Sequence, residues 1–333
     1  MPDATNLKVV LKSYPVGAPR VDDFAIVHEP LPKPGAGEIL CRTIYLSLDP
    51  YMRSRISGVR SYAAPVEIGQ VIVGGTVSEV VESNHRGFQR GDVVVGYDGW
   101  QGYAVSNGAG MRKLDPAAAP ISTALGVLGM PGLTAYVGLL DIGRPKRGET
   151  VVVSAASGAV GAVVGQLAKA EGCRAVGIAG TDAKCRYVVD ELGFDAGVNY
   201  RTGLPDKLAA ACPSGIDVYF ENVGGAVLDA VLALVNPGAR IPLCGLISEY
   251  NATSPAPGPN WRTLLTKRVR VQGFIVSDHL DRAPAFLGDL TPRVRDGRLK
   301  YREDVVDGLE QAPAAFIGLL EGKNFGKLIV RVG

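Results

Sequence analysis

The stretch that decides the fold is Val151-Val152-Val153-Ser154-Ala155-Ala156-Ser157-Gly158-Ala159-Val160-Gly161. Three β-branched residues give way to small ones, and a helix-like apolar pattern then continues to Lys169. This is the order of strand, phosphate-binding turn and helix that opens a dinucleotide-binding βαβ unit. Ala156, Gly158 and Gly161 have the spacing of a G-x-G-x-x-G fingerprint with alanine in the first place, and small residues there let a pyrophosphate approach the helix N-terminus. The stretch therefore predicts a pyrophosphate site formed by Gly158, Ala159, Val160 and Gly161.

The composition is typical of a globular enzyme, and 333 residues predict about two domains. Lysine and arginine (35) nearly balance aspartate and glutamate (33), so the net charge of +2 gives no electrostatic reason to expect nucleic acid or an anionic membrane as a partner. No apolar run reaches the roughly 18 residues of a membrane span. Residues 1–8 lack the pattern of a secretory signal. We therefore expect a cytoplasmic protein with no membrane and no nucleic-acid partner.

The five cysteines are scattered and never spaced as C-x-x-C, which makes a zinc ribbon or a disulfide framework an unlikely use of them. They are Cys41, Cys173, Cys185, Cys212 and Cys244. The three histidines are equally dispersed. We expect most of these residues to be ordinary core or surface positions.

Secondary-structure signals change along the chain. Short β-branched or alternating runs, punctuated by glycine and proline, fill residues 7–110 and predict an all-β, barrel-like domain. From about Ile121, strand and helix signals alternate, as in a parallel sheet with right-handed crossovers. Among these elements we expect a helix over 227–235 stopped by Asn236-Pro237-Gly238, and strands over 240–244 and 270–276. The last strand, 327–332, is expected to rejoin the N-terminal β domain.

At this point the chain resembles the medium-chain dehydrogenase/reductase superfamily, and within it the zinc-independent, NADPH-dependent alkenal/one reductases related to leukotriene and prostaglandin reductases. The resemblance covers nearly the whole chain. It rests on seven motifs in order: Leu48-Asp49-Pro50-Tyr51-Met52-Arg53, Gly99-Trp100-Gln101-Gly102-Tyr103-Ala104-Val105, Gly129-Met130-Pro131-Gly132-Leu133-Thr134-Ala135-Tyr136, the Ala155 to Gly161 turn, Phe220-Glu221-Asn222-Val223-Gly224-Gly225, Cys244-Gly245-Leu246-Ile247-Ser248-Glu249-Tyr250-Asn251 and Asn324-Phe325-Gly326-Lys327.

The resemblance implies an α/β fold, with a Rossmann doubly wound parallel sheet domain and a GroES-like β-barrel-type catalytic domain. The corresponding boundaries are 1–122 for the GroES-like catalytic domain, 123–297 for the Rossmann NADP-binding domain, and 298–333 for a segment that returns to the catalytic domain. Gly69-Gln70-Val71 stands where a zinc enzyme of the superfamily would have Gly-His-Glu, and the structural cysteine cluster is missing. We therefore expect no metal site, and a reduction of a conjugated double bond rather than a metal-assisted alcohol oxidation.

The cofactor choice depends on the end of the second strand of the Rossmann unit. An NAD site has an acidic residue there that binds the ribose hydroxyls, but Ile178-Ala179-Gly180-Thr181 contains none. Asp182 follows, and we interpret it as an acidic residue at the N-terminus of the next helix. Gly180, Thr181 and Lys184 offer a place for a 2′-phosphate, and the resemblance assigns that role to Lys184 and Tyr200. The alternative is that Lys184 is a solvated helix charge. We expect NADP(H).

Further cofactor contacts follow from the resemblance. Asn222 follows a strand, so it belongs at the carboxyl edge of the sheet where ligands bind, although asparagine also forms turns. The resemblance places it at the nicotinamide half. The remaining implied cofactor residues are Thr134, Cys244, Gly245, Ile247, Ser248, Tyr250, Phe274, Ile275, Val276 and Asn324; from sequence alone, residues 274–276 would be a core strand.

The chemistry that the resemblance implies is NADPH-dependent reduction of the carbon-carbon double bond of enones and enals. A neutral phenol can stabilise the resulting enolate by a hydrogen bond, and the candidates are Tyr250 first, then Tyr51 and Tyr62. Each is also a common packing residue. Two alternatives stay open: a zinc-free NADPH quinone oxidoreductase, and a non-catalytic cofactor-binding protein with a structural or regulatory role.

We also expect a homodimer. Superfamily members without zinc pair through the edge of the Rossmann sheet, and Val269-Arg270-Val271-Gln272-Gly273-Phe274 is a plausible edge strand.

Overall fold

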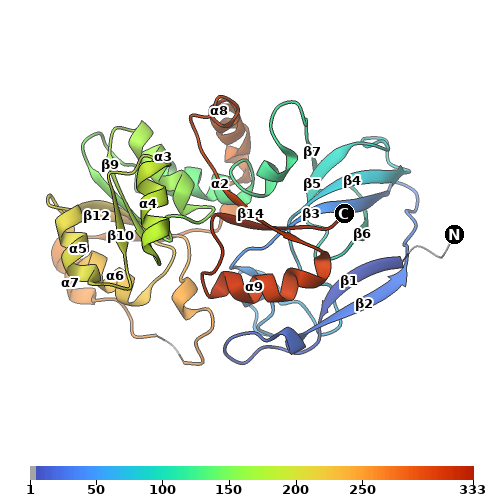
Figure 1. Cartoon of the computed structure of the whole chain (residues 1–333), viewed down its shortest axis with the longest axis horizontal. Coiled ribbons are helices and arrows are strands. Elements are labelled where there is room, and N and C mark those ends of the chain that lie inside the picture. The colour runs from blue at the N-terminus through green and yellow to red at the C-terminus, as the bar shows by residue number, and fades with distance from the viewer. Residues whose placement is uncertain (1–4, 255) are drawn as a thin grey trace. The chain divides into compact units, whose positions relative to one another are not determined.

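The structure is a computed structural model that describes residues 5–254 and 256–333. The chain forms two compact units, and Figure 1 labels many of their elements. Unit 1 contains the chain up to Leu125 together with Glu303–Asn324 and Leu328–Gly333, and unit 2 contains Gly126–Arg302 and Phe325–Lys327. The expected domain boundaries at 122 and 297 stay predictions. The expectation that no secretory signal occupies the N-terminus falls partly on residues 1–4, which lie outside the described residues.

Unit 2 is built on one parallel sheet with the strand order β10-β9-β8-β11-β12-β13. Along the chain, β8, β9 and β10 extend the sheet in one direction, and β11 to β13 extend it in the other. This reversal beside β8 defines a doubly wound sheet, so the predicted Rossmann sheet is confirmed. The strands are β8 (Thr150–Ser154), β9 (Arg174–Ala179), β10 (Ala196–Asn199), β11 (Ile216–Phe220), β12 (Val235–Leu243) and β13 (Arg270–Gly273).

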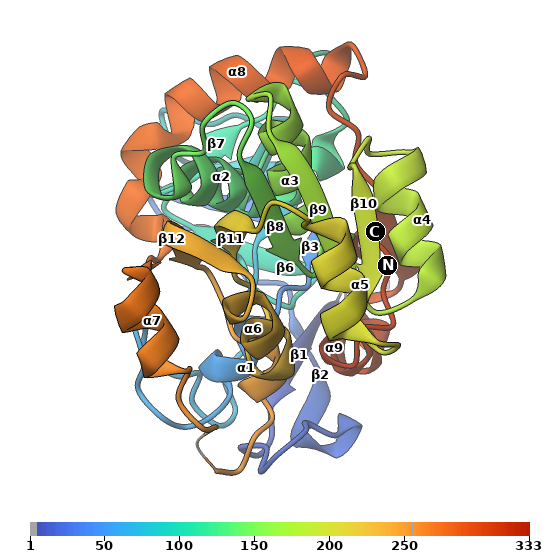
Figure 2. The same ribbon diagram turned by 90° about the vertical axis from the view of Figure 1, so that its left-hand side faces the viewer.

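Helices cover both faces of this sheet, because right-handed crossovers that run in opposite directions put their helices on opposite sides. In Figure 2, α5, α6 and α7 lie on one side of the sheet and α3 lies on the other. All five residues of β8 are buried in consequence. The helices of unit 2 are α2 (Met130–Tyr136), α3 (Gly161–Ala170), α4 (Asp182–Asp190), α5 (Leu204–Ala211), α6 (Gly225–Leu232), α7 (Trp261–Lys267) and α8 (Ala283–Arg295).

Several of the expected element boundaries in unit 2 are wrong, including that of the strand expected at 240–244, which is β12 and begins at Val235. Helix α6 ends at Leu232, and the segment Asn236-Pro237-Gly238 lies inside strand β12 instead of stopping a helix. The reason is a large irregularity in pairing: Ile216 lies opposite Val235, whereas Val218 lies opposite Arg240. The turn residues occupy this bulge, where ladder hydrogen bonds are not required. Strand β13 likewise ends at Gly273, and residues 276–282 form 3₁₀ turns.

Unit 1 consists mainly of antiparallel strands, as the β-rich pattern predicts. One sheet pairs β1 with β2, and the other follows the order β14-β15-β3-β4-β5-β7, with β6 also paired to β3. The C-terminal strand β15 pairs with β3, which confirms that the chain end rejoins the β domain. The elements are β1 (Thr5–Leu11), β2 (Phe24–Pro30), β3 (Ile39–Ser47), α1 (Met52–Arg55), β4 (Thr76–Ser83), β5 (Val93–Gly96), β6 (Tyr103–Ser106), β7 (Arg112–Lys113), β14 (Glu303–Asp307), α9 (Ala312–Leu320) and β15 (Lys327–Arg331).

The core of unit 1 is centred on Trp100, which is fully buried. Its ring stacks on Phe24 at a centroid distance of 5.8 Å and meets the edge of Phe316 at 5.7 Å. These contacts join β2, the segment before β6, and α9, so they hold elements from both ends of the chain in one core.

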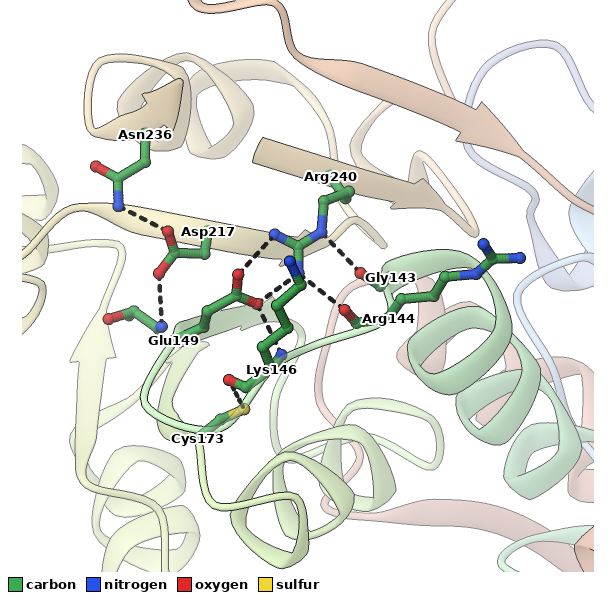
Figure 3. A network of polar contacts seen from close by, with 9 residues as sticks. Gly143, Arg144, Lys146, Glu149, Cys173, Asp217, Asn236 and Arg240 are labelled. Carbon is green, nitrogen blue, oxygen red and sulfur yellow. Dashed lines mark hydrogen bonds and ion pairs between the residues drawn. The ribbon is translucent and has the colours of Figure 1, made fainter. Parts of the chain in front are cut away.

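A network of polar contacts ties the amino ends of the strands in unit 2 (Figure 3). Arg240 forms an ion pair with Glu149 and also donates to the main-chain oxygens of Gly143 and Arg144. Asp217 accepts from the Thr150 amide at 2.9 Å. Because these charges lie at the end of the sheet opposite the nucleotide turn, we assign them a structural role.

Within residues 5–254 and 256–333, no helix is both long and apolar enough to cross a membrane. All five cysteines are free thiols.

Candidate functional site

The predicted phosphate-binding turn joins β8 to α3. Ala155 has the positive φ of 51°, and the Gly158 amide donates to its oxygen at 2.9 Å, which closes the turn tightly. A β-carbon at Gly161 would lie 2.5 Å from the Ala155 oxygen and 2.8 Å from the α-carbon of Ala156, so only glycine fits there. A β-carbon at Gly158 would meet only the Ala155 oxygen, at 3.1 Å. Gly161 is therefore required for the turn itself, whereas Gly158 leaves an open approach for a ligand.

Alanine at the first fingerprint position is accommodated by a glycine on the neighbouring strand. Ala156 is fully buried, and its amide donates to the Ile178 oxygen of β9 at 3.0 Å. A β-carbon at Gly177 would come within 2.7 Å of the Ala156 methyl group. The missing side chain at Gly177 thus makes room for the methyl group, and the turn keeps its close approach to the sheet.

Four predicted cofactor residues meet at the carboxyl ends of β9 and β10. Thr181 caps α4 by accepting from the Lys184 amide at 3.2 Å. A β-carbon at Gly180 would lie 3.1 Å from the Tyr200 ring, and that ring is 41% exposed. Gly180, Thr181, Lys184 and Tyr200 thus lie on adjacent chain segments, as a site for a 2′-phosphate would need.

Asp182 is engaged as a first-turn acid of α4. Its Oδ1 accepts from Asn199 Nδ2 at 2.8 Å. This contact ties α4 to the end of β10, and it agrees with the interpretation of Asp182 as a helix N-terminal acid.

Asn222 lies just beyond β11 and is anchored to the end of β8. Its amide donates to Ser154 Oγ at 2.9 Å, and its side-chain Nδ2 donates to the Ser154 oxygen at 2.8 Å. The side chain is therefore held in one orientation by the Ser154 oxygen. It lies at the carboxyl edge of the sheet, as expected.

The loop after β12 is fastened to the turn after β11 by main-chain hydrogen bonds. The Gly245 amide donates to the Glu221 oxygen, and the Ile247 and Ser248 amides donate to the oxygens of Asn222 and Val223. A β-carbon at Gly245 would lie 2.9 Å from Tyr250 Oη, so the phenol of Tyr250 reaches back over this loop. The predicted residues Cys244, Gly245, Ile247, Ser248, Tyr250 and Asn222 are thus brought together.

The remaining predicted cofactor residues lie in separate parts of the chain. Thr134 is buried in α2, and its hydroxyl donates to the Met130 oxygen at 2.8 Å. Phe274 meets the edge of Phe220 at a centroid distance of 6.3 Å. Residues 274–276 are half-buried and follow β13, so they do not form the core strand that the apolar pattern suggests. Asn324 belongs to unit 1, where it precedes β15.

The two other candidate phenols, Tyr51 and Tyr62, lie in unit 1 and are joined there by a third. Burial raises the pKa of Tyr51 far above its ordinary value, and the negative charge of Asp49 raises it further. Desolvation also raises the pKa of Tyr62 and of Tyr97, although Tyr97 is 70% exposed. The phenols of Tyr97 and Tyr62 also raise the pKa of Tyr51. All three are neutral near pH 7 and can donate a hydrogen bond.

Two family models match the chain, and the second begins inside the turn between β8 and α3. Residues 8–114 match a model described as the N-terminal domain of oxidoreductase, and residues 159–289 match one described as zinc-binding dehydrogenase. The NADPH-dependent curcumin reductase of Escherichia coli (strain K12) is 54% identical over 98% of this chain and 97% of that protein. The chain belongs to the zinc-independent alkenal/one reductases of the medium-chain dehydrogenase/reductase superfamily.

Other members of the family agree with this assignment. The NADP(+)-dependent 2-alkenal reductase of Nicotiana tabacum is 43% identical over 99% of the chain and 98% of that protein. The crystal structure of CurA from Vibrio vulnificus in complex with NADPH superposes with a TM-score of 0.94 at 53% identity, covering 98% of this chain and 99% of that one. The predicted family and two-domain fold are therefore confirmed.

The name of the second family model raises the question of a metal. In the described part of the chain, no group of three or more His, Cys, Asp or Glu side chains is placed to hold a metal ion. Burial raises the pKa of the Cys244 thiol to about 12, and the Glu221 carboxyl adds to this effect. Cys244, itself one of the predicted cofactor residues, is therefore a neutral thiol.

Sequence reasoning missed three residues of this region. Tyr97 carried no pattern signal, because it stands alone between glycine and aspartate. Ser154 and Glu221 were quoted in the opening stretch and in a family motif without a role, yet both side chains are fully buried beside Asn222. The available signal was a polar residue at or directly after the buried end of each strand.

Proposed function

We propose that this protein reduces the carbon-carbon double bond of α,β-unsaturated ketones and aldehydes with NADPH as cofactor. The observation that carries the proposal is the similarity, along nearly the whole chain, to reductases named for curcumin and for 2-alkenals. A solved relative of the same fold holds NADPH. The tight turn at Gly161 and the open approach at Gly158 fit a pyrophosphate, so the residues present fit this cofactor.

NADPH, when bound, supplies the hydride that the β-carbon of the substrate accepts. The carbonyl oxygen then carries the negative charge of an enolate, and a proton added at the α-carbon completes the saturated product. The chain has to hold the double bond in place, exclude water and donate a hydrogen bond to this oxygen. We assign the hydrogen bond to Tyr250, with Tyr51 and Tyr62 as further candidates, because a neutral phenol is a donor at the pH of the reaction.

We also propose which residues at the carboxyl edge of the sheet in unit 2 bind each part of the cofactor. We propose that residues 158–161 hold the pyrophosphate, that Lys184 and Tyr200 with Gly180 and Thr181 hold the 2′-phosphate, and that Asn222 contacts the nicotinamide half. The other proposed contacts are Thr134, Cys244, Gly245, Ile247, Ser248, Tyr250, Phe274, Ile275, Val276 and Asn324.

The test is turnover with a substrate panel. Purified protein is mixed with NADPH deuterated at the transferred position and with an enone, an enal or a quinone, while NADPH absorbance is followed. We expect oxidation with the enone and enal, and NMR of the product should find deuterium on the β-carbon. Faster turnover of the quinone would favour a quinone oxidoreductase, and tight NADPH binding without any turnover would favour a non-catalytic role.

We also propose that the protein is a homodimer joined at β13. This strand is the edge of the sheet in unit 2, and all four of its residues are exposed. Large apolar side chains are exposed on it and on the adjacent α7: Val271 (45%), Trp261 (72%) and Leu265 (77%). An unpaired edge beside exposed apolar groups is a surface suited to pairing with its own copy.

Light scattering coupled to size-exclusion chromatography tests this assembly. We expect a dimer for the native chain and a monomer for Val271→Lys, since a lysine on an edge strand opposes pairing. Val305→Lys, at a similarly exposed position in unit 1, is the control and should leave the mass unchanged. A native monomer would contradict the proposal.

We propose a cytoplasmic location, which five free thiols support because disulfides are rare in reducing compartments. Cell fractionation tests it, and recovery of the protein outside the cytoplasmic fraction would contradict it.

A further inference from the structure

A buried carboxyl group lies directly behind Asn222. Glu221 follows β11, the neighbour of β8 in the sheet, and its side chain is fully buried. Its Oε1 accepts from Tyr219 Oη at 2.8 Å, from Ser154 Oγ at 3.1 Å and from the Val223 amide at 2.6 Å. All three partners are uncharged, and Oε2 is buried with no hydrogen-bond partner among residues 5–254 and 256–333.

Ser154 connects this carboxyl group to Asn222. Its Oγ accepts from the Asn222 amide, and its main-chain oxygen accepts from Asn222 Nδ2. The hydroxyl therefore stands between Glu221 on one side and Asn222 on the other. Because Val152 lies opposite Tyr219 and side chains alternate along a strand, Ser154 and Glu221 emerge beside each other on the same face.

Glu221 also joins the loops that follow three strands. Its side chain reaches Ser154 at the end of β8 and the Val223 amide in the turn after β11. Its main-chain oxygen accepts from the amides of Cys244 and Gly245 after β12. A displacement of this one residue would move all three loops that surround the expected nicotinamide position.

A buried carboxyl group at position 221 lowers the stability of the fold compared with an apolar side chain. A buried carboxyl group with one unpaired oxygen is less favourable than an apolar side chain of the same volume. Its three accepted hydrogen bonds instead fix the orientation of the groups that donate them. The position next to Asn222 thus calls for a role in the site.

We propose that Glu221 is a positioning residue which, through Ser154 and the Val223 amide, holds Asn222 and the turn 222–224 in place for the nicotinamide half of NADPH. The inference rests on the proposed cofactor. It concerns the nicotinamide end alone, since the 2′-phosphate residues lie at the ends of β9 and β10.

Two ligands separate the ends of the cofactor without any turnover. NADP⁺ spans the whole site, whereas 2′,5′-ADP lacks the nicotinamide half. In Glu221→Leu, we expect the affinity for NADP⁺ to fall about tenfold, as for one lost polar contact, and that for 2′,5′-ADP to change less than about twofold. Glu221→Gln keeps an acceptor and the shape, so it should retain most of the NADP⁺ affinity. Equal weakening of both ligands would overturn the proposal.

Ser154→Ala provides a second variant if Glu221→Leu does not fold, because it removes only one hydroxyl. It should show the same selective loss of NADP⁺ affinity. Glu149→Gln is the matched control, a carboxyl group at the other end of the same sheet. It should leave the ratio of the two affinities unchanged; a selective loss there too would mean that any destabilisation of the sheet moves the ratio, which overturns the assignment.

Turnover with an enone gives an independent measurement. In Ser154→Ala, kcat should fall and the primary deuterium isotope effect should increase, while KM for the enone stays close to that of the native protein. Adding Glu221→Leu to Ser154→Ala should produce little further loss if the two act as one unit. Fully additive losses would contradict action through Ser154. A native protein inactive with every enone would refute the proposed reaction, and the ligand affinities would still test the positioning role.

Discussion

A carboxyl group at the amino end of the parallel sheet in unit 2 has a charged partner, whereas a carboxyl group at the carboxyl end has none. At the amino end, Glu149 lies 2.5 Å from Nη2 of Arg240, whose guanidinium also donates to two main-chain oxygens (Figure 3). At the carboxyl end, Glu221 has only uncharged partners and an oxygen left unpaired among the described residues. Burial raises the pKa of Glu149, but the hydrogen bonds and charge of Arg240 bring it below its ordinary value. Burial raises the pKa of Glu221, and its hydrogen bonds do not reverse the shift.

We infer from these partners and pKa shifts that the network around Glu149 stabilises the fold, whereas the network around Glu221 positions residues of the proposed site. An ion pair with further hydrogen bonds at the amino end holds the start of β8 against β12. The neutral network at the carboxyl end leaves Asn222 oriented and the nucleotide turn accessible. We expect the same strands to serve fold stability at one end and the proposed ligand site at the other, and substitutions at each end should separate the two properties.

The largest effect is expected from Gly161→Val at the carboxyl end. Its β-carbon would overlap the Ala155 oxygen and the Ala156 α-carbon, so the turn cannot keep its geometry. We expect a loss of about 3 kcal/mol or more in the free energy of unfolding, measured by denaturant titration. Gly158→Val is the matched variant, because its β-carbon would meet a single atom, the Ala155 oxygen at 3.1 Å, which a small shift relieves. It should remain folded while its affinity for NADPH falls about a hundredfold, as expected when a side chain blocks the approach to the helix amides.

Unchanged NADPH affinity in Gly158→Val would show that the pyrophosphate binds elsewhere. A stable Gly161→Val protein would show that the turn can open, and the distinction between the two glycines would fail.

Glu149→Gln should destabilise the amino end without touching the site. It removes a charge-assisted contact to Arg240, a loss of about 2 kcal/mol in the free energy of unfolding. NADPH affinity should stay within about twofold, since the network lies at the opposite end of the sheet. Asp296→Asn, which breaks an exposed pair with Arg298, is the control and should leave stability unchanged. A marked loss of NADPH affinity in Glu149→Gln would mean that the two ends are coupled.

Lys184→Ala tests the specificity of the carboxyl end. Removing its positive charge should lower the affinity for NADPH about tenfold and leave that for NADH unchanged, because only NADPH carries the 2′-phosphate. Arg186→Ala removes a charge from the same helix and is the control. Equal losses for both cofactors in Lys184→Ala would contradict the assigned role and favour a solvated helix charge.

The sequence predicted correctly those elements in which the local residue pattern and the packing of the folded chain favour the same structure. The apolar run at 327–332 predicted β15, which spans Lys327–Arg331, and the small residues at 156, 158 and 161 predicted the turn, where a β-carbon at Gly161 would overlap the main chain. The β12 bulge was out of reach, since Asn236-Pro237-Gly238 is a turn signal locally and only the pairing with β11 makes it part of a strand.

The site was predictable to a similar degree. Residues that follow strands could be assigned to the sheet edge, because parallel strands end together. The roles of Ser154 and Glu221 could not be assigned, because they depend on the register that brings residues 67 positions apart into contact.

The smallest effect, and the one that compares the two ends most directly, is the pH dependence of stability. The folded-state pKa of Glu149 lies below the unfolded value near 4.5, so its contribution is complete above that value and is lost as pH falls through the folded pKa. The folded-state pKa of Glu221 lies above 4.5, so its contribution is complete below that value and is lost as pH rises through the folded pKa.

The titratable neighbours of Glu221, which are Tyr219 and Cys244, stay neutral throughout, because burial raises both of their pKa values. Unfolding free energies of the native protein, Glu149→Gln and Glu221→Gln are compared between about pH 4 and about pH 7. The deficit of Glu149→Gln relative to the native protein should grow with rising pH, whereas that of Glu221→Gln should shrink. Parallel trends would show that both carboxyl groups are ionised alike, and the contrast between the two ends of the sheet would not hold.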